Sequence, residues 1–256
     1  MRPHICFLGT ALIAVVATMP AAADDAIRQP VDLALVLLTD VSRSMSDREY
    51  QMVKDGYKAA FADPEVIRAI LDNSKGVAVA YVEFSGRDEF TVVKGWDVLT
   101  DAASARTFGD AVAIATRTSS GNTALAPSIK KAAEMLTADA PAVGRRVIDV
   151  ASDHLWDGGR SATVRDAAVA AGITINALPI IDTRPIGTFD GRMSYAEWGS
   201  QGGVAFYRNY VIGGPGSFLI EVQDYGAYGE ALKRKLLREL ISSPGDDSME
   251  TFASAN

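Results

Sequence analysis

Residues 31–38 read VDLALVLL, a nearly continuous apolar stretch bounded by polar residues, and this stretch decides the fold. Strict alternation of apolar and polar residues would indicate a strand with one face in water, and it is absent here. A continuous run of this length is typical of a strand buried on both faces, as in a parallel sheet covered by helices. We therefore expect an α/β protein with this strand near its centre.

The chain beyond residue 38 alternates between strand and helix patterns. Strands are predicted at 76–84, 146–151, 173–181 and 218–222, and helices at 46–62, 65–71, 102–117, 124–137, 161–171 and 228–241. Residues 90–96 follow the second strand closely and pair with it as an antiparallel edge hairpin. This order predicts a three-layer α/β/α, Rossmann-like fold with a mostly parallel sheet and one antiparallel edge strand.

The N-terminus has the pattern of a secretory signal. Arg2 precedes the apolar run 5–19, and an A-x-A site ends at Ala23, so residues 1–23 are predicted to be cleaved. The alternative is a transmembrane anchor, but about 15 apolar residues are short for the roughly 20 that a spanning helix needs. We expect an exported, periplasmic or extracellular protein that does not span the membrane after cleavage.

Three further segments complete the predicted organisation. Residues 24–30 form a leader, residues 31–241 one domain, and residues 242–256 a flexible tail. Within the domain, residues 182–203 are polar and rich in glycine and are predicted to form a loop insertion.

The composition excludes several classes of protein. The 25 Lys and Arg residues against 32 Asp and Glu give a net charge of −7, which disfavours binding to nucleic acid or anionic lipid. Two histidines and one cysteine are too few for zinc fingers, iron–sulfur clusters or a disulfide scaffold. The only cysteine, Cys6, lies in the predicted signal, and a mature chain without thiols suits an oxidising compartment.

Polar side chains occur just after two predicted strands and before one helix, where α/β sheets bind ligands. The three clusters are DVSRS at 40–44, GNT at 121–123, and Asp153 after the strand 146–151. They offer only oxygen ligands, which suit a hard cation such as Mg²⁺, Mn²⁺ or Ca²⁺.

Each cluster also has a purely structural interpretation. Ser44, Ser46 and Thr123 can cap helices, with Glu49 completing a capping box after Ser46, and Asp153 can be a turn residue. His154 could be a ligand or a base, but a lone histidine in a loop is more often a polar surface residue, and we interpret it as one. The basic run 233–235 near the end of the last helix compensates the helix dipole.

The combination of these clusters resembles the metal ion-dependent adhesion site (MIDAS) of von Willebrand factor type A (VWA) domains. The resemblance covers residues 31–241 and rests on DVSRS at 40–44, GNTAL at 121–125 and RVIDV at 146–150 leading to Asp153. More narrowly, RRVIDV at 145–150 and YVIGGPG at 210–216 resemble a bacterial family of secreted proteins of unknown function that carry this domain.

The resemblance implies a set of metal ligands. Ser42, Ser44 and Thr123 would bind the cation directly, whereas Asp40 and Asp153 would hold its waters. Mg²⁺ is the first choice of cation, with Mn²⁺ or Ca²⁺ as alternatives. The third aspartate of this site is usually followed by glycine, but His154 stands there, and Asp157-Gly158 follows shortly. Either Asp153 or Asp157 could therefore serve, and the strand end favours Asp153.

A site of this kind implies a non-enzymatic binding module. Such a module would capture an Asp or Glu carboxylate of a protein or peptide partner through the cation. The alternative is a metal-dependent hydrolase with Asp40 as nucleophile or with metal-activated water. Against it, the sequence has no G-x-S-x-G motif, no second aspartate two residues after Asp40, and no phosphate-binding glycine loop. A two-lobed solute-binding protein would need more chain than one sheet provides.

Overall fold

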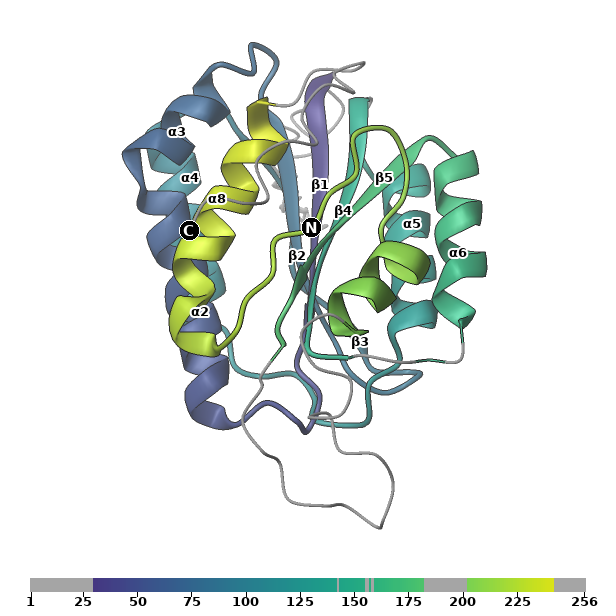
Figure 1. The fold of residues 1–256 in the computed structure, drawn as a ribbon. Helices are drawn as coiled ribbons and strands as arrows, with labels where there is room; N and C mark the ends of the chain where they lie inside the picture. Colours follow the sequence, from purple (N-terminus) through teal and green to yellow (C-terminus); the bar gives the residue numbers. More distant parts are fainter. Residues whose placement is uncertain (1–29, 142, 155–156, 158, 182–201, 242–256) are drawn as a thin grey trace, which may run out of the picture.

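A computed structural model describes residues 30–141, 143–154, 157, 159–181 and 202–241. They form a central sheet between two layers of helices (Figure 1). The strands are β1 (Val31–Asp40), β2 (Val77–Phe84), β3 (Phe90–Leu99), β4 (Val143–Ser152) and β5 (Ile173–Pro179). The three-layer α/β/α architecture predicted from the alternating pattern is confirmed.

The sheet has the order β3-β2-β1-β4-β5, with β1 at its centre. β1 runs parallel to both β2 and β4, and β4 runs parallel to β5. β3 pairs with β2 in the antiparallel direction and is the predicted edge hairpin. Thr39 of β1 lies opposite Glu83 of β2 and Ala151 of β4, so the carboxyl ends of these three strands lie at one edge of the sheet.

Helices cover both faces of the sheet. One layer contains α2 (Asp47–Ala62), α3 (Pro64–Leu71), α4 (Ala102–Ile114) and α8 (Tyr228–Ile241), on the left in Figure 1. The other layer contains α5 (Leu125–Ala138), α6 (Arg160–Ala170) and a π-helix, Tyr207–Val211. Since both faces are covered, each face of β1 lies in an apolar core.

The side chains of β1 alternate between the two cores. Leu33, Leu35 and Leu37 pack under the α2 layer, and the intervening Val36 and Leu38 pack under the α5 layer. All five have exposed fractions of 1% or less. This double burial explains why the sequence of β1 is continuously apolar.

Two predicted elements differ in the structure. The helix predicted to reach Arg117 ends at Ile114. Residues 218–222 form no strand; Leu219 and Val222 make single parallel bridges to Ala177 and Ile180 beside β5. The predicted signal (1–23) and tail (242–256) lie outside the described residues, as do nearly all of the leader (24–30) and of the loop insertion (182–203). Within the described ranges, no helix combines the length and the apolar character needed to cross a bilayer.

Candidate metal centre

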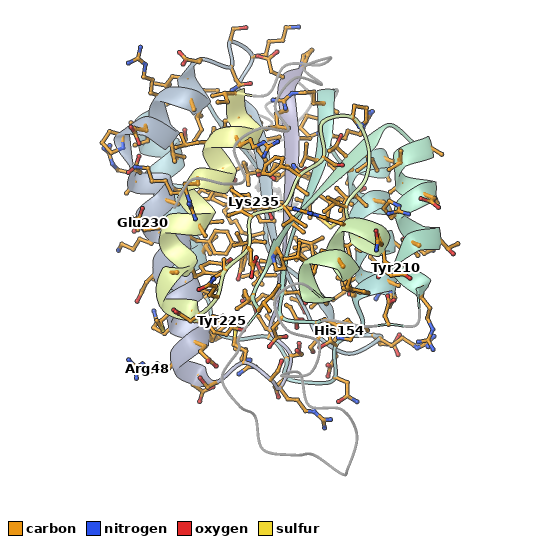
Figure 2. The ribbon with its side chains drawn as sticks, viewed as in Figure 1. Arg48, His154, Tyr210, Tyr225, Glu230 and Lys235 are labelled. Atoms are coloured by element: carbon orange, nitrogen blue, oxygen red, sulfur yellow. The ribbon has the colours of Figure 1, made fainter. Side chains whose placement is uncertain are left out.

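Three loops meet at the carboxyl ends of the parallel strands, at the lower edge of the sheet in Figure 1. The first loop follows β1, the second joins α4 to α5, and the third follows β4. They carry the three oxygen-rich clusters found in the sequence. His154, labelled in Figure 2, directly follows the third cluster and marks this edge.

The hydroxyl groups of the three clusters form a continuous chain. Thr123 donates its hydroxyl hydrogen bond to Ser42 Oγ at 2.9 Å, and Ser42 Oγ lies 3.1 Å from Ser44 Oγ. Ser44 in turn donates to Asp153 Oδ1 at 3.0 Å. Residues separated by more than 100 positions in the sequence are thereby brought within hydrogen-bond distance.

Asp40 lies beneath this chain of hydroxyls, with only 2% of its surface exposed. Its Oδ1 accepts the Ser42 backbone N–H at 2.9 Å, and its Oδ2 accepts the Ser152 hydroxyl at 2.6 Å. The first bond closes the turn that follows β1, so Asp40 shapes the loop that holds both serines. Burial raises the pKa of Asp40, although these two bonds oppose the shift.

Asp153 is the second carboxylate of the cluster. Burial, followed by the nearby charge of Asp40, raises the pKa of Asp153 to about 7. Asp40 is buried and Asp153 is half-buried, and their negative charges repel each other. A cation beside them would relieve both the repulsion and part of the desolvation cost.

The donor set fits a hard divalent cation. Three hydroxyls and two carboxylates converge, and all of their donor atoms are oxygen, as Mg²⁺, Mn²⁺ and Ca²⁺ prefer. Among the described residues, no group of three or more His, Cys, Asp or Glu side chains is placed to hold a metal.

The hydroxyls of Ser44 and Thr123 do not cap helices and are therefore available to the site. Ser46 caps α2, and Glu49 completes the predicted capping box, so α2 does not need Ser44 as a cap. Thr123 does not cap α5 either, because the N-cap residue is Ala124 and makes no side-chain cap bond. The capping interpretation is thus confirmed for Ser46 and wrong for Ser44 and Thr123.

The structure separates the two candidate aspartates of the third cluster. Asp157 Oδ2 accepts hydrogen bonds from the backbone N–H and the hydroxyl of Ser161, in the first turn of α6. Asp153, in contrast, accepts a hydrogen bond directly from Ser44 of the hydroxyl chain. The ring of His154 packs edge-on against Phe206, with the ring centroids 6.2 Å apart.

Sequence reasoning missed Ser152. Its hydroxyl donates to Asp40, and it also accepts the backbone N–H of His154 at 3.0 Å. Ser152 thus joins the first cluster to the third. The parallel pairing of β1 with β4 could have indicated this contact. Because Thr39 lies opposite Ala151, the residues that follow them, Asp40 and Ser152, are neighbours.

A hollow of about 700 Å³ lies beside Thr123. Its walls come from the turn after β2, from the start of α5, and from the region before α6, and they include Arg87, Asp88, Glu89 and Arg160. Glu89 is held by its own turn, since it accepts bonds from Ser85 and the Gly86 N–H. The volume is within the usual range for ligand pockets.

Comparison with known proteins identifies a family for this chain. A family model described as "Protein of unknown function (DUF1194)" matches residues 30–244, which is most of the chain. No curated protein matches the sequence.

Solved structures with a similar fold include proteins with VWA domains. The pilus adhesin SpaC from Lactobacillus rhamnosus GG has a TM-score of 0.55 and 16% identity, covering 82% of this chain and 30% of SpaC. Proximal thread matrix protein 1 (PTMP1) from the mussel byssus, with a zinc-occupied MIDAS motif, has a TM-score of 0.53 and 14% identity, covering 82% and 46%. BatB from Bacteroides thetaiotaomicron has a TM-score of 0.50 and 16% identity, covering 82% and 100%. The chain thus spans less than half the length of SpaC or PTMP1, and at these identities the likeness shows the fold.

Proposed function

Because the chain belongs to the DUF1194 family and has the VWA fold, we propose that it is a divalent-cation-dependent protein-binding module of the bacterial cell envelope. One observation carries the proposal: the hydroxyls of Ser42, Ser44 and Thr123 converge beside Asp40 and Asp153. The adhesin role of SpaC and the zinc-occupied MIDAS of PTMP1 support it as properties of proteins with the same fold.

The residues of the cluster divide into two groups. Ser42, Ser44 and Thr123 would hold the cation directly, and Asp40 and Asp153 would orient the waters around it. Neutral hydroxyls leave most of the cation's charge uncompensated, so a bound cation would supply a positive centre for a partner's carboxylate. Mg²⁺ fits best because it takes six oxygen ligands and retains several waters.

The proposed partner is a protein or peptide that offers an Asp or Glu side chain. The hollow beside Thr123 gives room for the residues next to that carboxylate. The wall carries the guanidinium groups of Arg87 and Arg160 and three carboxylates, those of Asp88, Glu89 and Asp157, so groups of both signs are available to a partner segment.

The buried position of Asp40 argues against the hydrolase alternative. A nucleophilic carboxylate needs an oxygen that can reach a substrate. Both oxygens of Asp40 accept hydrogen bonds from the protein, and only 2% of the residue is exposed. We therefore propose a binding role without catalysis.

Export to the envelope is part of the proposal. The signal pattern at residues 1–23 supports it, and the exported protein is expected to begin at Asp24 or within a residue or two. N-terminal sequencing of the protein recovered from the envelope checks this, and an intact Met1 in the membrane fraction would contradict it.

Partner capture tests the function. Immobilised parent protein is exposed to envelope extract with Mg²⁺ or with a chelator, and bound proteins are quantified. Thr123→Ala removes one proposed ligand, and Thr137→Ala, at an exposed position on α5, removes the same hydroxyl away from the site. We expect capture by the parent and by Thr137→Ala with Mg²⁺ only, and none by Thr123→Ala.

Capture that survives both the chelator and Thr123→Ala would show that partners dock on another surface. Calorimetric titration of each protein with Mg²⁺ and Mn²⁺ accompanies the assay, so that loss of the cation is distinguished from loss of the partner. Turnover of a substrate without stable capture would favour the hydrolase.

A further inference from the structure

The segment that carries Thr123 has no helical or strand structure between α4 and α5. Backbone bonds fix its C-terminal half: the Arg43 N–H donates to the Gly121 carbonyl at 3.0 Å, and the Ala124 N–H donates to the Ser85 carbonyl at 2.7 Å. Its N-terminal half is held differently, by charged side chains that the metal site itself does not use.

Arg117 connects this segment to the loop after β1. Its Nε and Nη2 donate to the Val41 carbonyl at 3.1 and 2.8 Å, and Nη2 also donates to the Ser42 carbonyl at 2.7 Å. Val41 and Ser42 lie between Asp40 and Ser44, so the guanidinium holds the backbone from which the two serine hydroxyls project. The side chain of Arg117 is only 16% exposed.

Glu83, at the end of β2, anchors the next residue of the segment. Its Oε2 accepts the backbone N–H and the hydroxyl of Thr118 at 2.9 and 3.0 Å. Its Oε1 accepts the Tyr50 hydroxyl at 2.8 Å, and the residue is fully buried. A buried carboxylate with several donors holds its partners in one arrangement.

Lys54 completes the network from α2. Its Nζ lies 3.8 Å from Glu83 Oε1, and it donates to the Ala115 carbonyl and the Tyr50 hydroxyl, each at 3.1 Å. Lys54 is fully buried, and burial lowers its pKa although the charge of Glu83 opposes this. A buried ion pair seldom adds net stability, so conformational specificity is the better reason to maintain one here.

We propose that Arg117 is a positioning residue of the metal centre. It aligns the hydroxyls of Ser42, Ser44 and Thr123 and thereby raises the affinity for the cation without touching it. Glu83 and Lys54 support it by holding the neighbouring residues of its segment. This inference rests on the proposed function. Residues that orient metal ligands typically change affinity by about 10- to 100-fold when mutated.

The direction in which cation affinity changes when Arg117 is replaced distinguishes a positioning role from a purely electrostatic one. Arg117 carries a positive charge close to the Ser42 carbonyl, so it repels a cation at the site. If charge alone mattered, Arg117→Gln would bind the cation more tightly than the parent. Loss of positioning has the opposite effect, because the two carbonyls lose their donors and the serine loop is no longer held.

Mn²⁺ binding tests the proposal, with affinity measured by calorimetry and bound waters counted by proton relaxivity. We expect Arg117→Gln to bind Mn²⁺ about 10- to 100-fold more weakly and to retain more water on the ion, as hydroxyl ligands are lost. Arg117→Lys keeps the charge but not the planar pair of donors, so its affinity also stays below that of the parent. Arg106→Gln, at an exposed position on α4, removes the same charge and leaves affinity and water count unchanged.

A thermal melt in chelator checks that each variant folds. If Arg117→Gln does not fold, the comparison is made with Arg117→Lys alone. The proposal is overturned if both Arg117 variants match the parent in affinity and water count, or if Arg117→Gln binds more tightly. A parent protein that binds no Mn²⁺ would overturn the proposed function itself and this inference with it.

Discussion

Two aspartates at the third cluster differ by only four positions in the sequence and have different environments. Asp153 is bonded to the hydroxyl chain through Ser44 and is close enough to Asp40 for their charges to interact. Asp157 is bonded to Ser161 in the first turn of α6, where a carboxylate stabilises a helix N-terminus. We infer that Asp153 serves the cation and Asp157 serves the helix.

Single substitutions test this assignment. Asp153→Asn keeps the shape but loses the charge that holds metal-bound waters, so Mn²⁺ affinity should fall by about 10- to 100-fold. Asp157→Asn should leave affinity unchanged and lower the free energy of unfolding by about 1 kcal/mol through the weaker cap. Calorimetric titration and urea unfolding measure the two effects. The opposite pattern would assign the site to Asp157.

At this scale the sequence predicts which oxygen-bearing residues lie together, but not the residues that support them. Ser42, Ser44, Thr123 and Asp153 stand at strand ends or before a helix, and the structure brings them together. Arg117 acts on residues 75 and 76 positions away. Neither hydrophobic periodicity nor motif spacing predicts a contact of that kind, because the residues lie next to each other only in the folded chain.

At the scale of elements, the predicted strands and helices recur in the structure apart from residues 218–222, and the main error among the helices has a tertiary cause. The pattern of α4 continues in sequence to Arg117, yet the helix ends at Ile114. Beyond it, the Ala115 carbonyl accepts from Lys54, and Arg117 turns toward the loop after β1. Helix propensity is a weak preference that such bonds override.

The last helix, α8, is anchored by a buried charge that the sequence does not reveal. The basic run 233–235 is predicted to compensate the dipole late in the helix, but it lies in the middle of α8, and Lys235 is buried against two carboxylates. Its Nζ lies 2.5 Å from both Asp149 on β4 and Glu239 on α8, and the residue is fully buried (Figure 2). Lys233, two residues earlier, pairs at the surface with Asp63 and Glu65.

Replacing each lysine by methionine compares the two environments on one helix. Lys235→Met leaves Asp149 and Glu239 buried without their cation, so the free energy of unfolding should fall by about 3–5 kcal/mol. Lys233→Met removes a partly exposed pair and should cost much less. Urea unfolding measures both, and equal losses would show that the buried pairing does not hold α8.

The same cluster predicts a pH dependence of stability. Burial, followed by the charge of Asp149, raises the pKa of Glu239 from 4.5 to about 7. The titratable and charged groups that face it are Lys235 on its own helix, Asp149 and Arg145 on β4, and Tyr57 on α2. Between about pH 4.5 and 7 the folded state therefore holds a proton that the unfolded state releases, and this contribution to stability is lost as the pH rises.

Glu239→Gln removes this titration. At 1.36 kcal/mol per pKa unit, the contribution is at most about 3 kcal/mol across the window, so the variant should lose stability less steeply between pH 4.5 and 7. Urea unfolding in chelator at several pH values measures the slope. Glu134→Gln, at an exposed position on α5, is the control and should follow the parent. Parallel slopes for Glu239→Gln and the parent would exclude Glu239 as the source.

At the scale of the whole molecule, the residues of the candidate metal centre come together only in the folded chain. Its residues come from the end of β1, the α4–α5 segment and the end of β4, and the sheet order places β1 next to β4. The fold class followed from the apolar run of β1 and the alternation after it. The site needed the resemblance as well, since periodicity alone does not indicate which strand-end residues converge.

Binding of a cation should therefore stabilise the entire domain. A ligand that binds only the folded state, at 100 times its dissociation constant, adds about 2.7 kcal/mol to the free energy of unfolding. We expect the parent to gain this amount when Mg²⁺ replaces chelator in a urea titration. The double variant Ser42→Ala with Ser44→Ala should fold in chelator and gain nothing, because two of the three hydroxyl ligands are gone.

Ser74→Ala lies in the exposed turn before β2, away from the carboxyl ends of the strands. It is the matched control and should gain as much stability from Mg²⁺ as the parent. The comparison separates binding at this site from general effects of salt, which act on every variant alike. If the double variant gains as much from Mg²⁺ as the parent, the cation binds elsewhere, and the convergence of hydroxyls at the end of β1 is a feature of the fold alone.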